Sequence, residues 1–123
     1  MGDDDFWDDY DEGYYDYYDD SSIVVQLVDP GGGIGIHPAI IIDGHVFLFT
    51  SKQRHRGSSG YIEVYSGDGG LDLDSFLNVK DWHRYDDCHI GRELGYLSRA
   101  TLEEIVSEVK RLHPHINCDN CWY

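Results

Sequence analysis

The sequence predicts one α+β domain that is mainly β: a small antiparallel sheet, curled into a barrel and closed by a C-terminal helix. Three observations support this class. β-branched and aromatic residues dominate the middle of the chain, they fall in short runs between glycine-containing turns, and one segment near the C-terminus has helical spacing. At 123 residues the chain is long enough for one small core and too short for two.

Apolar, β-branched runs mark the predicted strands. The first run ends at Asp29-Pro30 and a glycine run, which is not a phosphate-binding loop because no Lys-Ser/Thr pair follows it. Asp43-Gly44 lies between two later runs and is a strong signal for a two-residue hairpin. The predicted strands cover residues 23–28, 39–42, 45–49 and 61–65, one or two short strands within 67–79, and a last edge at 95–97.

One helix is predicted after Ser98, which is a suitable N-cap residue. Leu97 and Leu102 flank this cap at the spacing of a hydrophobic staple. Pro114 ends the helix. Apolar residues recur at helical spacing and form one stripe, made of Leu102, Ile105, Val106, Val109 and Leu112.

The net charge of −15 is concentrated at the N-terminus. Residues 1–22 hold ten acidic and seven aromatic residues but no Lys or Arg, whereas residues 23–123 hold 14 acidic and 9 basic residues. We therefore expect an acidic, aromatic-rich arm (1–22), a folded domain (23–112) and a C-terminal Cys/His tail (113–123). The arm is either a solvated, disordered leader or a segment that folds onto a cationic groove, with carboxylates in place of phosphates.

No apolar run reaches the roughly 18 residues that a membrane-spanning helix needs, and the acidic N-terminus is unlike a signal peptide. The sequence thus predicts a soluble, cytoplasmic protein with no membrane contact. Its three cysteines, Cys88, Cys118 and Cys121, argue against a disulfide framework. Cys118 and Cys121 have zinc-like spacing, and Cys88 is a candidate further ligand. Free thiols on a polar tail, or a redox pair, explain the same residues.

The hairpin predicts a site at its open end. If Asp43-Gly44 is the loop, His37 faces Thr50 across the two strands, and such pairs have Cβ atoms about 4.5–5.5 Å apart. Ser51 follows Thr50, and the cations Lys52, Arg54 and Arg56 come next. Imidazole, hydroxyl and cationic groups together suit phosphodiester chemistry. The alternative is that His37 is a surface residue at a strand start.

The segment 81–93 concentrates ionisable and aromatic side chains. Trp82 and Arg84 are candidates for stacking on and pairing with RNA. A loop with one buried aromatic residue explains the segment equally well. Asp72 and Asp74 alternate along a predicted strand, so we interpret them as a solvated face and assign them no chemistry.

The order of these features resembles that of the MazF/PemK/Kid family of toxin endoribonucleases. The matching pieces span residues 23–112 and are "IVVQLV", "GGGIGIHPAIII", "VFLFTSKQ", "YIEVY", "LDLDSFLNV" and "LGYLSRATLEEIVSEVKRL". The "TSK" ending also looks like that of ToxN-type toxins. The resemblance implies an SH3-like barrel and a ribonuclease that cleaves single-stranded RNA by 2′-hydroxyl attack without metal or other cofactor. It also implies a homodimer and an antitoxin partner.

By position, the family's catalytic arginine falls on His37 and its catalytic threonine or serine on Thr50, with Ser51 beside it. Histidine at this position is a departure, because arginine is always charged and binds phosphate bidentately. Either His37 acts as a general acid or base while Lys52, Arg54 or Arg56 supplies the charge, or activity is weakened or lost.

Two other functions stay open at this stage. The same barrel, without catalytic activity, would serve as an RNA- or protein-binding module. Alternatively, the acidic arm would be the functional part, a nucleic-acid mimic that blocks a DNA- or RNA-binding protein.

Overall fold

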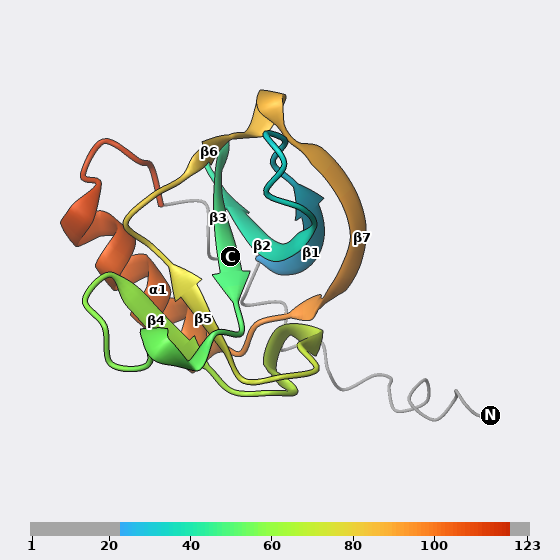
Figure 1. Ribbon diagram of the computed structural model, residues 1–123. Coiled ribbons are helices and arrows are strands. Elements are labelled where there is room, and N and C mark those ends of the chain that lie inside the picture. The colour runs from blue at the N-terminus through green and yellow to red at the C-terminus, as the bar shows by residue number, and fades with distance from the viewer. Residues whose placement is uncertain (1–22, 119–123) are drawn as a thin grey trace, which may run out of the picture.

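A computed structural model describes residues 23–118 of the chain (Figure 1). These residues form a mainly antiparallel β-sheet with one C-terminal α-helix, which confirms the predicted α+β class. The acidic arm (1–22) and Cys121 lie outside the described residues. The strands are β1 (Val24–Asp29), β2 (His37–Ile42), β3 (His45–Thr50), β4 (Tyr61–Val64), β5 (Ser75–Asn78), β6 (His83–Arg84) and β7 (His89–Tyr96), and the helix is α1 (Arg99–Leu112).

The sheet curls strongly, and β1, β2, β3 and β7 surround a common interior (Figure 1). The strand order is β4-β5-β3-β2-β1-β7, with β6 paired to β3. The register of the β1–β7 pair shifts at two places within Val25–Val28, so the ladder between these two strands is irregular there. Within residues 23–118, the end strands β4 and β7 do not pair with each other. The expected closed barrel is therefore not confirmed, and the sheet has a seam between its two ends.

A short 3₁₀ turn, η4 (Asp68–Gly70), packs against β7 at this seam. Gly70 has a φ of +75° and lies directly against the backbone of Leu94 and Gly95 in β7. Only a residue without a Cβ combines this φ with so close an approach. The seam is thus covered by a backbone-to-backbone contact that depends on glycine.

The β2–β3 hairpin has the predicted register. Ala39 pairs with Leu48, and Ile42 pairs with His45. Asp43 and Gly44 have φ values of +50° and +75°, both in the left-handed region that a two-residue type I′ turn requires. Asp43 is able to adopt this conformation because Asp tolerates it better than most residues. The Asp-Gly pair therefore determines both the turn and the strand pairing.

Alternation along β3 divides the interior into two apolar clusters. Phe47 and Phe49 belong to the larger cluster, which also contains the apolar stripe of α1. Val46 and Leu48 belong to a smaller cluster on the other face of β3, with Val28, Ala39 and the partly buried Ile90. Successive side chains of a strand point to opposite faces, so one continuous apolar run contributes to both clusters.

Helix α1 begins and ends as predicted. The Ser98 hydroxyl accepts a hydrogen bond from the Thr101 backbone N–H, and Leu97 and Leu102 are both buried in the larger cluster. After the helix, the chain continues to pack against the domain: the His113 side chain bonds to the Val79 carbonyl oxygen at 2.8 Å, and Ile116 is buried. Residues 113–118 are therefore in contact with the folded domain.

Part of the sheet was longer than predicted. The last edge expected at 95–97 is the end of an eight-residue strand, β7, which begins at His89. The segment 81–93, interpreted above as a cluster or loop, contains β6 and most of β7. This strand lies at the edge of the sheet and exposes His89, Arg92 and Glu93, so it lacks the apolar alternation that identifies half-buried strands.

In the described range, no helix has both the length and the apolar character needed to cross a membrane.

Candidate functional site

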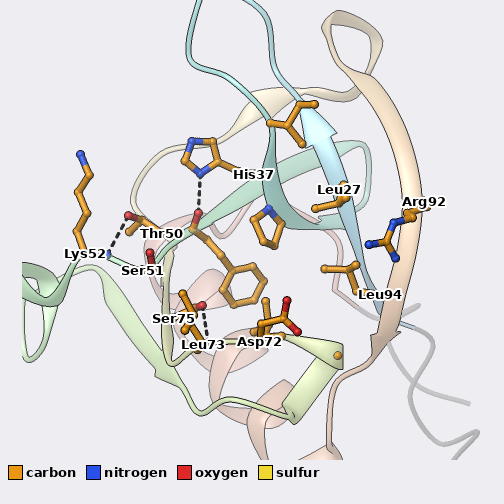
Figure 2. A pocket seen from close by; sticks show the side chains of 15 residues that line it. Leu27, His37, Thr50, Ser51, Lys52, Asp72, Leu73, Ser75, Arg92 and Leu94 are labelled. Carbon is orange, nitrogen blue, oxygen red and sulfur yellow. Dashed lines mark hydrogen bonds between the residues drawn. The ribbon is translucent and has the colours of Figure 1, made fainter. Parts of the chain in front are cut away.

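A pocket of about 540 Å³ lies where the open end of the β2–β3 hairpin meets the seam of the sheet (Figure 2). The predicted catalytic residues His37, Thr50 and Ser51 all line it, and so does Lys52. Strand β7 forms the opposite wall, and the segment between η4 and β5 forms a third side. This volume is within the range of about 300–1,000 Å³ that is usual for small-molecule sites.

His37 is the first residue of β2 and is half-buried. Its Nδ1 lies 2.9 Å from the Phe49 carbonyl oxygen, as the dashed line in Figure 2 shows. A carbonyl oxygen only accepts hydrogen bonds, so Nδ1 carries the proton and donates it. In the neutral imidazole, Nε2 then holds the lone pair. The backbone of β3 thus fixes the tautomer that has Nε2 as the basic atom.

Thr50 ends β3, and Ser51 and Lys52 follow it on the rim of the pocket. The Thr50 Oγ1 accepts a hydrogen bond from the Lys52 backbone N–H at 3.3 Å. Because that oxygen acts as an acceptor, its own O–H proton is free to be donated to a ligand. The Lys52 ammonium is exposed and projects outward in Figure 2. This rim therefore offers one hydroxyl donor, a second hydroxyl and a cation within three consecutive residues.

Arg92 of β7 lines the same pocket and was not predicted. All nine Lys and Arg residues of the chain lie within the described range. Five of them form ion pairs with carboxylates there, namely Arg56, Lys80, Arg84, Arg99 and Arg111. Arg92 and Lys52 have no such pair among residues 23–118, and both line this pocket. The pocket therefore has two cations that no carboxylate of the described range neutralises, Arg92 in its wall and Lys52 on its rim.

Asp72 is the second residue that sequence reasoning missed. It lies in the segment before β5 and lines the pocket (Figure 2). Its carboxylate has no hydrogen bond or ion pair with any residue in 23–118, including Arg92 on the opposite wall. Asp74, by contrast, accepts a hydrogen bond from the Ser66 backbone N–H and does not line the pocket. Their alternation in the sequence predicted one shared, solvated face for Asp72 and Asp74, but the structure gives them different environments.

Arg54 and Arg56 do not line the pocket. They lie in and just after η3 (Gln53–His55), and Arg56 bonds to Glu63 and packs over the Phe76 ring. The pKa of His55 is lowered from 6.5, first by partial burial and then by the charges of Arg54, Lys80 and Lys52. This region next to the pocket therefore has a positive local potential.

Trp82 and Arg84 lie at the other end of the hairpin. They line a separate cavity of about 380 Å³ together with Gly44 and His45, and the Trp82 ring meets the His45 ring edge-on at 4.3 Å. The length of β3 separates this cavity from Thr50, which is about 16 Å at the usual rise of a strand. The structure thus divides the predicted RNA-binding residues between two places.

The cysteines are not brought together. Cys118 is buried in the larger apolar cluster, whereas Cys88 packs against the smaller one and donates a hydrogen bond from Sγ to the Arg84 carbonyl oxygen. Within residues 23–118, no three His, Cys, Asp or Glu side chains form a group suited to a metal ion. Since Cys121 is outside that range, the zinc expectation for the three cysteines stays a prediction. In the described range, Cys88 and Cys118 form no disulfide with each other, as the free-thiol interpretation expects, but Cys118 is buried against the domain and is not on a polar tail.

Comparisons with protein-family models, curated proteins and solved structures gave no significant match. The resemblance to the MazF/PemK/Kid family therefore stays a prediction.

Proposed function

We propose that the protein is an endoribonuclease that cleaves single-stranded RNA at this pocket without a metal ion. One observation carries the proposal: His37, Thr50, Ser51, Lys52 and Arg92 come from separate parts of the chain and line one pocket. A base, hydroxyl donors and unpaired cations are the groups that phosphodiester cleavage uses. The family resemblance supports the same activity, along with the SH3-like barrel, the homodimer and the antitoxin partner.

In the proposed reaction, Nε2 of His37 takes the proton of the RNA 2′-hydroxyl. The 2′-oxygen then bonds to the adjacent phosphorus, and the bond from phosphorus to the 5′-oxygen breaks. The 5′-oxygen takes a proton from water, and the imidazolium returns its proton to solvent. The products are a 2′,3′-cyclic phosphate and a 5′-hydroxyl. Thr50 donates its hydroxyl proton to a non-bridging phosphate oxygen, where charge increases in the transition state.

Arg92 supplies the charge that the family pattern places at position 37. A guanidinium is always protonated and binds phosphate through two N–H groups, whereas an imidazole binds at one point. In this proposal the two tasks are divided between β2 and β7, with His37 moving the proton and Arg92 stabilising the phosphate. Lys52 contributes a second cation from the rim.

The test is cleavage of end-labelled single-stranded RNA by the full chain in EDTA, with product ends analysed for cyclic phosphate. We expect His37→Gln to lower the rate by about 100-fold or more, the usual contribution of a general base. Arg92→Gln and Thr50→Val are expected to lower it as well. Arg111→Gln is the matched control, because Arg111 is on α1 and pairs with Glu108 away from the pocket.

Two results would contradict this function. If the wild-type chain and the His37 and Arg92 variants cleave RNA at the same rate, the pocket is not the site of catalysis. Tight RNA binding without cleavage by the full chain would favour a binding module that lacks catalysis.

A further inference from the structure

The pocket has an apolar half that phosphate chemistry does not use. Its wall includes Leu27, Pro38, Phe49, Leu71 and Leu94, which come from β1, β2, β3, the segment before β5, and β7. Two further lining residues, Ile36 and Leu73, are 67% and 62% exposed. Exposed apolar side chains beside a formed pocket indicate a ligand with an apolar surface. A nucleobase presents such a surface on both of its faces.

Within residues 23–118, Asp72 is the only carboxylate that lines this pocket. An ionised carboxylate is an acceptor with two oxygens and no proton to donate. Its lack of a partner within residues 23–118 leaves both oxygens available to a ligand. Arg92 and Asp72 line the same pocket without forming an ion pair with each other, so the two opposite charges are not in contact.

We propose that the apolar half of the pocket binds one base of the RNA strand and that Asp72 makes it selective for guanine. Guanine presents two adjacent donors, N1–H and the N2 amino group, on its Watson–Crick edge, and these match the two carboxylate oxygens. Adenine and cytosine present an amino donor next to a ring nitrogen lone pair, which repels the second oxygen. Uracil presents one donor between two carbonyl groups. A carboxylate therefore pairs bidentately with guanine alone.

This inference rests on the proposed function in one respect, that the ligand is RNA. It divides the pocket between two parts of a nucleotide. The cations Lys52 and Arg92 bind phosphate, while Asp72 and the apolar wall bind the base. The arrangement also explains why an acid is present at an anion-binding site, where on charge alone it would weaken binding.

The test measures binding separately from cleavage. Fluorescence anisotropy of the full chain is recorded with labelled 2′-O-methyl tetranucleotides, which lack the attacking hydroxyl, in a uracil background with one guanine, adenine or cytosine. We expect the guanine oligonucleotide to bind about 10-fold more tightly or better, as is usual for a bidentate pair. Asp72→Asn should abolish that preference. Asp74→Asn is the matched control, since an Asn Oδ1 is still able to accept from the Ser66 N–H.

A second variant, Asp72→Glu, keeps the carboxylate and should retain part of the preference, and circular dichroism verifies that each variant is folded. Equal binding of all oligonucleotides, or a guanine preference that survives in Asp72→Asn, overturns the inference. Cleavage of unmodified RNA is measured in parallel. Cleavage without guanine preference overturns only the base pocket, and guanine-selective binding without cleavage overturns only the nuclease function.

Discussion

His37, Thr50, Ser51 and Lys52 were predictable because strand pairing is a local property. Once Asp43-Gly44 is identified as a two-residue loop, the register of the hairpin follows, and the structure shows it from Ile42–His45 out to Ala39–Leu48. His37 and Thr50 lie beyond the last of these pairs, at the open end of the hairpin. Arg92 and Asp72 were not predictable in this way. They reach the pocket only because β7 pairs with β1 and η4 packs against β7, contacts between segments far apart in sequence. The pocket residues that come from the hairpin were therefore predicted to lie together, and those that come from distant segments were missed.

His55 is expected to make stability depend on pH. Its pKa in the folded state is lowered by partial burial and by Arg54, Lys80 and Lys52, so the unfolded chain binds this proton more readily. The resulting loss of folding stability is absent well above pH 6.5, grows as the pH falls from 6.5 toward the lower folded-state pKa, and is complete below that pKa. The experiment compares thermal unfolding of wild type and His55→Gln at pH 7.5 and 5.5. We expect the unfolding temperature of the wild type to fall more between pH 7.5 and 5.5 than that of His55→Gln. The same pH dependence in both proteins would contradict this expectation.

Cys88 is expected to react slowly with alkylating agents. Burial, followed by the charges of Asp87 and Asp29, raises the pKa of its thiol above 9.0, and only the thiolate is nucleophilic. Iodoacetamide labelling at pH 8, followed by mass spectrometry of the peptide containing Cys88, measures the rate. Asp87→Asn removes one of the two negative charges, so the thiolate fraction and the rate should rise. An unchanged rate in that variant would exclude the electrostatic contribution.

At the scale of elements, η4 and α1 are joined by one carboxylate. Asp68 accepts hydrogen bonds from the Ser98 backbone N–H at 2.7 Å, the Ser98 hydroxyl at 2.9 Å and the Thr101 hydroxyl at 2.6 Å. The Ser98 cap was predicted from sequence, whereas its link to Asp68, thirty residues earlier, was not. An N-cap has a short-range sequence signal, but a carboxylate that supports the cap from another loop has none.

We expect Asp68→Ala to destabilise the protein by about 2 kcal/mol, the usual range for hydrogen bonds to a charged group. The control is Asp81→Ala, because Asp81 forms an exposed pair with Lys80 that should contribute at most about 1 kcal/mol. Urea unfolding followed by circular dichroism measures both variants. Equal midpoints for the two would mean that Asp68 does not anchor the helix.

Strand β7 shows why the predicted sheet was incomplete. Its exposed positions hold His, Arg and Glu, and its glycines at 91 and 95 approach neighbouring backbone closely. Edge strands are commonly polar and irregular because that composition discourages pairing with other chains. The features that protect an edge also remove the alternation by which a strand is recognised. The α+β class was therefore predictable from composition, but the extent of the sheet was not.

For the whole molecule, the decisive feature is a curled sheet whose end strands do not pair within residues 23–118. Closure at the seam depends instead on η4 lying against β7 (Figure 1). The pocket is at the same place, and Gly70, Leu71 and Leu94 line it. Because the seam has no strand pairing, room for a pocket is left between β7 and the segment before β5, a space that a strand pair would fill in a fully hydrogen-bonded barrel. Stability of the seam and shape of the pocket should thus change together.

Gly70→Ala tests this coupling, with Gly33→Ala as its matched control. Both glycines have similar left-handed φ values, +75° and +79°, so alanine carries a similar backbone cost of about 1 kcal/mol at each position. A Cβ at Gly33 meets no atom within 4 Å, whereas a Cβ at Gly70 overlaps the Leu94 carbonyl group. We expect Gly70→Ala to lower the free energy of unfolding by about 3 kcal/mol or more, because η4 must move away from β7 to make room for the Cβ. If the variant still folds, we expect it to cleave RNA more slowly than the wild type. Gly33→Ala should lower the free energy of unfolding only by the backbone cost of about 1 kcal/mol and should cleave RNA at the wild-type rate. Equal losses of stability in the two variants would show that the approach of η4 to β7 does not hold the seam. If Gly70→Ala is destabilised but cleaves RNA at the wild-type rate, the shape of the pocket does not depend on the stability of the seam.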